Sequence, residues 1–260
     1  MAALRRRRPL ANTPSSIEPT APGLQHVVLR ALGPLRSTLG DVLEFLLPQR
    51  CPGCGVPADP ARLLCASCIE RLPVLDVPIC ARCLREGQPP DRCARHPGDR
   101  VHVAWVYDER VALIVHALKF GGQPGLAIAY AGAIARALPG SARHPDVVTS
   151  VPLHAARRRE RGYDQAACIA EALADAIGVP FVPGVLRRMR ATRAQSELGP
   201  AARRLNVLGA FEVTRPRWVT GRRVLLVDDV LTTGATMAEC LGALRASRAR
   251  TTGAALAWAQ

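Results

Sequence analysis

Four closely spaced pairs of metal-binding residue types lie between residues 51 and 96, and this spacing strongly limits how that segment can fold. Two residues separate the members of each pair, which are Cys51 and Cys54, Cys65 and Cys68, Cys80 and Cys83, and Cys93 and His96. A turn of this length presents both side chains to one tetrahedral Zn²⁺. Two pairs complete a site, so the spacing predicts a four-cysteine site followed by a site of three cysteines and one histidine. Closed ligand sets of this kind are typical of structural zinc.

A disulfide framework is the alternative interpretation of so many cysteines, and it requires an oxidising compartment. Residues 1–20 contain four consecutive arginines but no apolar stretch long enough for a secretory signal. No apolar run reaches the roughly 20 residues of a membrane helix. These features favour zinc, and they predict a cytoplasmic protein without a membrane span. The remaining cysteines, Cys168 and Cys240, lie in apolar helical contexts and are predicted to be packing residues.

The order of segments predicts three parts. Residues 1–34 are expected to be a disordered basic tail. Residues 35–98 are expected to hold a short amphipathic helix, from the leucine spacing in 35–48, and the double zinc ribbon. Such a small segment with few large apolar residues needs metal to fold. Residues 99–260 are long enough for a domain with its own core.

Strand and helix patterns alternate through 99–260 and predict an α/β fold with a doubly wound, mostly parallel sheet. The expected strands are VHVAWVY (101–107), DVVTSVP (146–152), VLRRMR (185–190), AFEV (210–213), RRVLLVDD (222–229) and TGAALAWA (252–259). The expected helices are 110–120, 125–138, 165–178 and 235–247. Ligands of such sheets bind beyond the carboxyl ends of the strands.

The stretch VLLVDDVLTTGAT (224–236) combines features of a ribose 5-phosphate site. Asp228 and Asp229 follow four aliphatic residues, and their carboxylates can accept hydrogen bonds from the adjacent hydroxyls of a sugar. The turn that follows offers backbone N–H groups, hydroxyls and the positive end of a helix to a phosphate. It comprises Thr232, Thr233, Gly234, Ala235 and Thr236.

The Walker B strand of a nucleotide triphosphatase is the competing interpretation of this stretch. It requires a glycine-rich loop that ends in Gly-Lys-Ser or Gly-Lys-Thr. The chain has one lysine, Lys119, with Leu118 before it and Phe120 after it. The sequence therefore contains no such loop, which excludes this interpretation.

The stretch 224–236 resembles the signature of phosphoribosyltransferases that bind 5-phosphoribosyl-1-pyrophosphate. Together with the cysteine pairs and three further blocks, it is similar to the ComF/GntX family of competence-associated proteins over roughly residues 40–260. Those blocks are Tyr107 with ALKFGG (117–122), SVPLHAARRRERGYDQA (150–166), and TRAQSEL with RRLNVLGAF (within 192–211). One departure is Asp164, where the family pattern usually has asparagine, and it adds a negative charge beside the expected pyrophosphate site.

The resemblance implies a type I phosphoribosyltransferase-like fold and a role for each block. Asp228 and Asp229 are the implied catalytic residues that hold the ribose, and pyrophosphate would bind with Mg²⁺ at Lys119, Arg157 and Arg161. Every other strongly basic position of the chain is arginine, so Lys119 is either a remnant of arginine-biased codon usage or a site that needs a compact ammonium group. The second interpretation fits crowded diphosphate oxygens.

Three functions remain open from the sequence. The chain could be an active phosphoribosyltransferase of DNA uptake or nucleotide salvage, a competence protein that holds single-stranded DNA beside a helicase, or a regulator that senses phosphoribosyl pyrophosphate. A net charge of +14 favours polyanionic partners. Scarce aromatic residues, at 4%, speak against base stacking as the main contact with DNA. The acceptor base and the oligomeric state are not readable from the sequence.

Overall fold

The computed structural model places most of the chain from residue 50 onward. It describes residues 50–51, 53–58, 63–75, 77–84, 93, 96, 98–120, 126–153, 159, 162–189 and 207–259. All of them belong to one compact unit, Gln49–Gln260. The helix expected at 35–48 and the basic tail expected at 1–34 lie outside the described residues.

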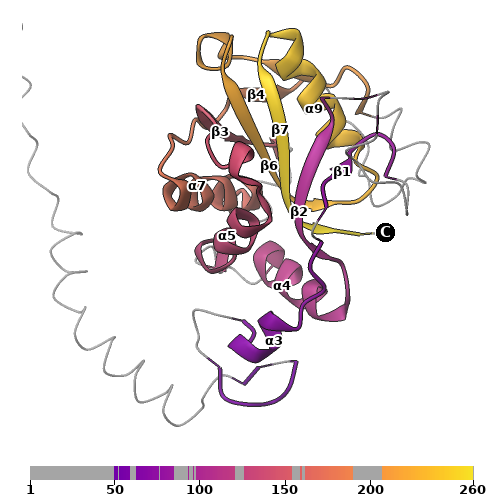
Figure 1. The fold of residues 1–260 in the computed structure, drawn as a ribbon, viewed down its shortest axis with the longest axis vertical. Coiled ribbons are helices and arrows are strands. Elements are labelled where there is room, and N and C mark those ends of the chain that lie inside the picture. Colours follow the sequence, from indigo (N-terminus) through magenta and orange to yellow (C-terminus); the bar gives the residue numbers. More distant parts are fainter. Residues whose placement is uncertain are drawn as a thin grey trace, which may run out of the picture. The chain divides into compact units, whose positions relative to one another are not determined.

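A five-stranded sheet forms the centre of this unit (Figure 1). Its order is β1 (Ile79–Cys80), β2 (Arg100–Val106), β7 (Arg250–Trp258), β6 (Arg223–Leu231) and β3 (Val147–Ser150). The last four strands are parallel to one another, and β1 is antiparallel to β2. The mostly parallel sheet expected from the sequence is therefore confirmed. A separate antiparallel pair consists of β4 (Leu186–Arg188) and β5 (Phe211–Val213).

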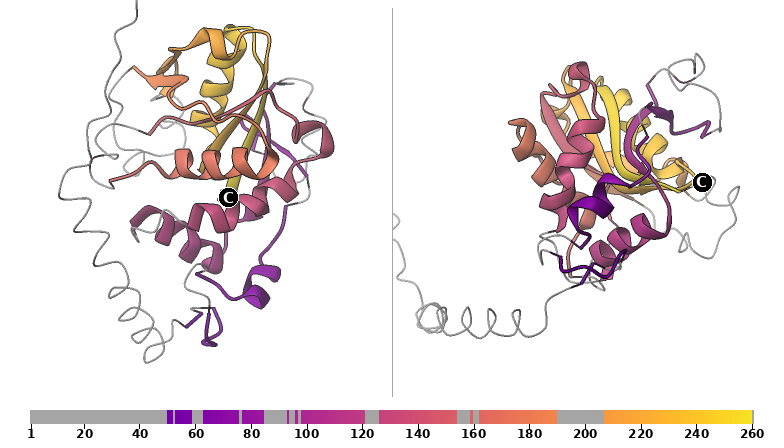
Figure 2. Two further views of the ribbon diagram at one scale, coloured as in Figure 1. Left: turned by 90° about the vertical axis from the view of Figure 1, so that its left-hand side faces the viewer. Right: turned by 60° about the horizontal axis from the view of Figure 1, so that its bottom comes forward.

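Helices cover both faces of this sheet, as the two views of Figure 2 show. The helices on one face are α4 (Glu109–Phe120), α5 (Leu126–Ala137) and α7 (Gln165–Ile177), which bury their apolar residues in one hydrophobic cluster. The opposite face carries α9 (Ala235–Ala246), which packs with β4 and β5 in a second cluster. Two short 3₁₀ helices, Gly140–Ala142 and Pro216–Trp218, lie in connections. This arrangement is the doubly wound α/β fold.

The helices and strands begin and end close to the positions that the sequence pattern predicts. Helix α7 ends at Gly178, which has φ +70° and donates its N–H to the last turn, as expected for a left-handed C-cap. Strand β6 continues to Leu231, two residues past the expected end, because it pairs with β7 as far as Trp258. The pattern missed α3 (Ala66–Glu70) and β1, which are too short to show a period.

The zinc-ribbon segment lines the outer edge of β2. Strand β1 pairs with Val101 and Arg100, and Val74 forms a further antiparallel bridge with Trp105. Backbone hydrogen bonds extend this contact at both ends, from Val106 N to Pro73 O and from Ala81 N to Asp99 O. Residues 73–75 and 79–81 therefore cover the edge of the sheet at both ends of β2.

A buried histidine in β2 makes stability depend on pH. Burial, and then the charge of Arg100, lower the pKa of His102 from 6.5 to about 4. The unfolded chain therefore binds a proton at a higher pH than the folded chain does, so stability is complete above pH 6.5 and falls as pH drops toward 4.

We expect wild type to lose about 3 kcal/mol more stability than a His102→Leu variant between pH 7 and pH 4. Urea unfolding of both proteins across this range measures the difference. Titratable groups that the two proteins share contribute equally to both and drop out of the comparison. Parallel pH profiles would contradict the assignment.

None of the helices in the described part of the chain combines the length and the apolar character needed to cross a membrane.

Candidate functional site

The two acidic residues of β6 lie at the carboxyl end of the sheet, and their side chains alternate with the strand. Asp228 continues the row of Leu226, which belongs to the cluster under α9, and Asp229 continues the row of Val227, which belongs to the cluster under α4, α5 and α7. Asp228 Oδ1 accepts the N–H of Asp229 at 2.9 Å, and Asp229 Oδ1 accepts the N–H of Val230 at 2.7 Å. These bonds fix both carboxylates close to the strand.

The electrostatics of the pair are unequal. Burial raises the pKa of Asp228 well above its usual value, and the charge of Asp229 raises it further, whereas Lys119 lowers it. Asp228 also affects Cys240 of α9. Burial, and then the charge of Asp228, raise the pKa of the Cys240 thiol. A carboxyl group whose pKa is raised by burial and by a neighbouring charge is typical of functional sites.

The lone lysine lies at this acidic pair. Lys119, in the last turn of α4, places its Nζ 3.5 Å from Asp229 Oδ2, and the two side chains are about a quarter or less exposed. Tyr163 donates a hydrogen bond from its hydroxyl to the carbonyl of Leu118 and so holds the end of α4 against the segment before α7. The described parts of three sequence blocks, residues 117–120, 162–165 and 227–236, therefore meet at the carboxyl end of the sheet.

The turn Thr232–Thr236, here named the phosphate turn, leads directly into α9. Gly234 is the N-cap of this helix and has φ +66° and ψ −4°, a left-handed conformation that favours glycine. The first N–H groups of a helix have no acceptor within the helix and carry its positive dipole end. The phosphate turn therefore offers the N–H groups and the positive end of a helix, and phosphate binding there stays a prediction.

Asp164 has a structural role that explains why aspartate can stand where the family pattern has asparagine. It is the N-cap of α7, it is 8% exposed, and its carboxylate accepts the N–H of Ala167 at 3.1 Å. Asp and Asn are equally good at this position. The positive helix end balances the added charge. Arg157 and Arg161, the pyrophosphate residues that the resemblance implies, lie outside the described residues.

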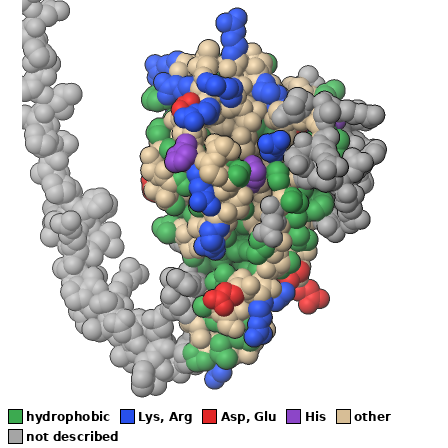
Figure 3. Space-filling view, in the orientation of Figure 1, with side chains coloured by type: hydrophobic (Ala, Val, Ile, Leu, Met, Phe, Trp, Pro, Cys, Tyr) green, Lys and Arg blue, Asp and Glu red, His purple; other side chains and the backbone are tan. Residues whose placement is uncertain are grey.

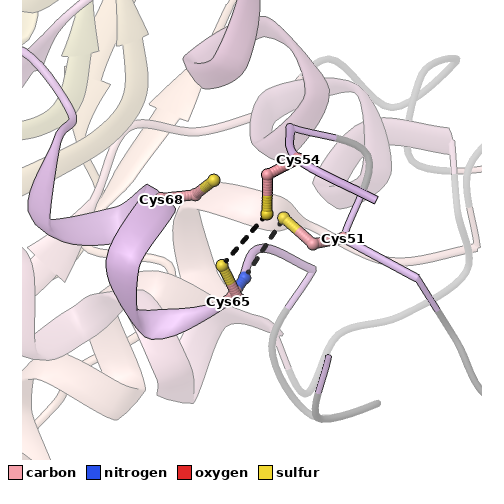
Figure 4. A group of neighbouring side chains, drawn as sticks. All are labelled: Cys51, Cys54, Cys65 and Cys68. Atoms are coloured by element: carbon pink, nitrogen blue, oxygen red, sulfur yellow. Dashed lines mark hydrogen bonds between the residues drawn. The ribbon is translucent and has the colours of Figure 1, made fainter. Parts of the chain in front are cut away.

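The first cysteine cluster fits a zinc ion. Figure 4 shows Cys51, Cys54, Cys65 and Cys68 turned toward one point, and their sulfur atoms all lie within 4.8 Å of one another. Sulfur atoms around tetrahedral Zn²⁺ are about 3.8 Å apart, and the Cys54 and Cys65 sulfurs are 3.5 Å apart. Cys51 and Cys68 are buried in the same hydrophobic cluster as α4 and α5.

The second cluster has the same compactness. The ligand atoms of Cys80, Cys83, Cys93 and His96 lie within 4.8 Å of one another. Nδ1 of His96 is 3.8 Å, 3.4 Å and 3.5 Å from the three sulfurs, in that order, so it occupies the fourth corner. Cys168 and Cys240 belong to neither cluster and pack in the core, as predicted.

A buried carboxylate that the sequence analysis did not single out ties the second cluster to α9. Asp99, 1% exposed, accepts hydrogen bonds from Arg82, which lies between Cys80 and Cys83, and from Arg245 of α9 at 2.6 Å. Arg82 also reaches Glu239 of α9 at 3.5 Å. An acidic residue three positions after the last ligand is the only sequence signal for this contact.

Two family models match the chain and agree with this architecture. Residues 42–96 match the double zinc ribbon domain, and residues 163–260 match the phosphoribosyl transferase domain. The two clusters are therefore the structural zinc sites of a double ribbon, and the α/β part is a phosphoribosyltransferase-like domain.

Curated relatives cover most of the chain. DNA utilization protein YhgH of Salmonella typhi is 30% identical over 228 residues, which are 85% of this chain and 89% of the relative. Competence protein F of Haemophilus influenzae is 28% identical over 197 residues, 70% of this chain and 84% of the relative. A solved structure of the allosteric regulatory enzyme of purine biosynthesis is 21% identical, covering 54% of this chain and 29% of that one, with a TM-score of 0.36. Zinc ribbons, sheet and relatives together make the chain a member of the ComF family of competence-associated, phosphoribosyltransferase-like proteins.

Proposed function

We propose that this protein binds 5-phosphoribosyl-1-pyrophosphate with Mg²⁺ and acts as a phosphoribosyltransferase in the use of external DNA. The observation that carries the proposal is the meeting of Lys119 with Asp229, 3.5 Å apart, directly before the phosphate turn. One cation, two carboxylates and a helix N-terminus at the carboxyl end of a parallel sheet match the parts of the ligand: diphosphate, ribose and 5-phosphate. The names of the relatives supply the DNA context.

Each part of the site has a task in the proposed reaction. The phosphate turn holds the 5-phosphate through backbone N–H groups. Asp228 and Asp229 accept hydrogen bonds from the ribose hydroxyls and orient C1 toward a nitrogen nucleophile. Lys119 stabilises the negative charge that grows on the leaving diphosphate. The C1–O bond to pyrophosphate breaks, and a bond from C1 to the nucleophile forms through an oxocarbenium-like transition state.

Carboxylate oxygens are ligands that Mg²⁺ accepts, so Asp228 and Asp229 fit a site at which the metal is shared with the substrate. Bound Mg²⁺ would neutralise charge on the diphosphate. The raised pKa of Asp228 lets a carboxyl group at this edge exchange a proton in a range where ordinary carboxylates do not.

Titration calorimetry with phosphoribosyl pyrophosphate and Mg²⁺ tests the proposal. We expect wild type to bind and Asp229→Asn to bind at least about tenfold more weakly, because a hydrogen bond to a charged group is worth about 1.5–3 kcal/mol. Asp146→Asn is the matched control, since Asp146 is a carboxylate paired with Arg223 at the amino end of the sheet. Wild type that does not bind this ligand would refute the proposal.

Turnover separates an enzyme from a sensor. Release of pyrophosphate on addition of one of the common nucleobases would establish transfer. Binding without release from any of them would favour a regulator that senses the ligand.

Binding of single-stranded DNA is a second candidate function. Basic residues at the amino end of the sheet, where the parallel strands begin, favour it. The parallel strands β2, β6 and β7 each begin with an exposed arginine: Arg100, Arg223 and Arg250. Arg223 is paired with Asp146, and Arg223 and Arg250 are neighbours across the strands. Figure 3 shows basic side chains gathered at the top of the molecule, where β6 and β7 begin. This amino end of the sheet is opposite the carboxyl end, where Asp228 and Asp229 lie.

Salt dependence tests this candidate. We expect affinity for an oligothymidine to fall steeply between about 50 and 200 mM salt, because bound arginines displace counterions from the phosphates. The double variant Arg100→Ala/Arg250→Ala should reduce the slope of log K against log salt by about 1.4, at roughly 0.7 per phosphate. Arg110→Ala, at a half-buried arginine paired with Asp108, is the control. Salt-independent binding would exclude the electrostatic account.

A further inference from the structure

The phosphate turn touches the second zinc cluster through the backbone. Gly234 is buried, and a Cβ atom added there would lie 2.8 Å from the carbonyl carbon of Ala81 and closer still to its oxygen. No side chain fits in that space, and backbone atoms cannot move aside as the end of a flexible side chain can. Ala81 has no exposed surface. The contact therefore fixes the two backbones against each other.

Zinc ligation by Cys80 and Cys83 would restrict where the Ala81 carbonyl lies. Ala81 directly follows the ligand Cys80 and precedes Cys83 by two residues. The turn closes with a hydrogen bond from Leu84 N to Cys80 O at 2.9 Å, and Leu84 has a positive φ of 36°. Without a metal to hold both thiolates, this turn would depend on that hydrogen bond, on the bonds that Ala81 N and Arg82 donate to Asp99, and on a strained residue.

Further contacts join the same cluster to the helix that begins at Gly234. Arg82 lies within the turn of Cys80 and Cys83 and reaches Glu239 of α9. Asp99, three residues after the ligand His96, pairs with Arg245 near the other end of α9. Glu239 in addition accepts the N–H of Gly209 at 3.1 Å. Both ligand-bearing segments of the second cluster are thus connected to α9.

The first zinc cluster provides a natural comparison. Its buried ligands Cys51 and Cys68 pack in the cluster of α4 and α5, whereas Ala81 packs in the cluster of α9. The two zinc sites therefore support opposite faces of the sheet. Only the second, among the described residues, meets the phosphate turn.

We propose that the second zinc site holds the phosphate turn in its ligand-binding conformation, with Gly234 and the Ala81 carbonyl as the positioning contact. The inference rests on the proposed function in one respect: the ligand of the turn is a phosphate monoester. Coupling between two sites is reciprocal. A phosphate monoester bound at the turn must therefore increase the zinc affinity of the second site. Loss of that zinc must in turn lower the affinity of the turn for the phosphate monoester.

Equilibrium competition with a chromogenic zinc chelator tests the coupling on the full wild-type chain. Ribose 5-phosphate at saturation should raise the zinc affinity of one of the two sites by about fivefold or more, the lower range of typical coupling. Ribose, which lacks the phosphate, should change neither site. Cys83→Ser, which removes a second-site ligand, should abolish the effect of ribose 5-phosphate on zinc affinity. Cys54→Ser, which removes a first-site ligand, should retain this effect.

The outcomes separate the inference from the proposed function. Binding of ribose 5-phosphate without a change in either zinc affinity would overturn the coupling and leave the proposed function standing. An equal increase at both sites would mean general stabilisation and would also overturn it. Absence of ribose 5-phosphate binding by the wild type would overturn both. The wild-type titration decides the question even if a cysteine variant fails to fold.

Discussion

Replacing Cys51 by serine is expected to destabilise the whole folded part of the chain and to lower its melting temperature by about 6–12 °C. Cys51 is 1% exposed and packs in the hydrophobic cluster that α4, α5 and α7 share. Structural zinc contributes roughly 10 kcal/mol or more to the folding of small zinc domains. A third of this, about 3 kcal/mol, corresponds to about 6–12 °C at roughly 2–4 °C per kcal/mol for a chain of this size.

Calorimetry and zinc analysis check this expectation. Wild type should contain two zinc ions per chain, and the variant one. Cys168→Ser is the matched control, because Cys168 is a half-buried cysteine outside both clusters, and its melting temperature should change little. A variant in which the zinc ribbon unfolds while amide protection in β6 and β7 stays unchanged would show that the shared cluster does not couple the two parts.

Replacing Lys119 by arginine is expected to lower the affinity for phosphoribosyl pyrophosphate at least about tenfold, although the charge is retained. The guanidinium is planar and larger, so it cannot occupy the place of an ammonium 3.5 Å from Asp229 and still meet crowded diphosphate oxygens. Loss of one charge-assisted hydrogen bond, at about 1.5–3 kcal/mol, accounts for the tenfold loss.

A second ligand isolates the contact. Ribose 5-phosphate lacks the diphosphate and should bind wild type and Lys119→Arg equally well through the phosphate turn and the acidic pair. Equal affinity of both proteins for phosphoribosyl pyrophosphate would instead mark the only lysine of the chain as a remnant of codon usage.

Local patterns made much of the fold predictable from the sequence. The strands of the sheet core are aliphatic runs with turn residues at their ends, and α7 ends at a glycine because a left-handed C-cap needs one. The zinc ligands were predictable because each pair is a local turn. These features depend on residues close together in the chain.

Contacts between distant segments were not predictable in the same way. Nothing near Lys119 indicates a partner 110 positions later, and the meeting with Asp229 arises only when α4 packs beside β6. Gly234 was expected as a turn residue, but its neighbour Ala81 belongs to a different part of the chain. Asp99 has only its position, three residues after the last zinc ligand, as a local signal. Such contacts depend on topology, which a single sequence specifies only weakly.

The backbone contacts along β2 have a consequence for how the protein can be dissected. Residues 73–75 and 79–81 occupy hydrogen-bonding groups of β2 that would otherwise face solvent. A fragment that begins at residue 99 would present an open strand edge, which readily pairs with another chain. The phosphoribosyltransferase-like domain expressed alone would therefore self-associate, and a soluble fragment must begin before residue 73.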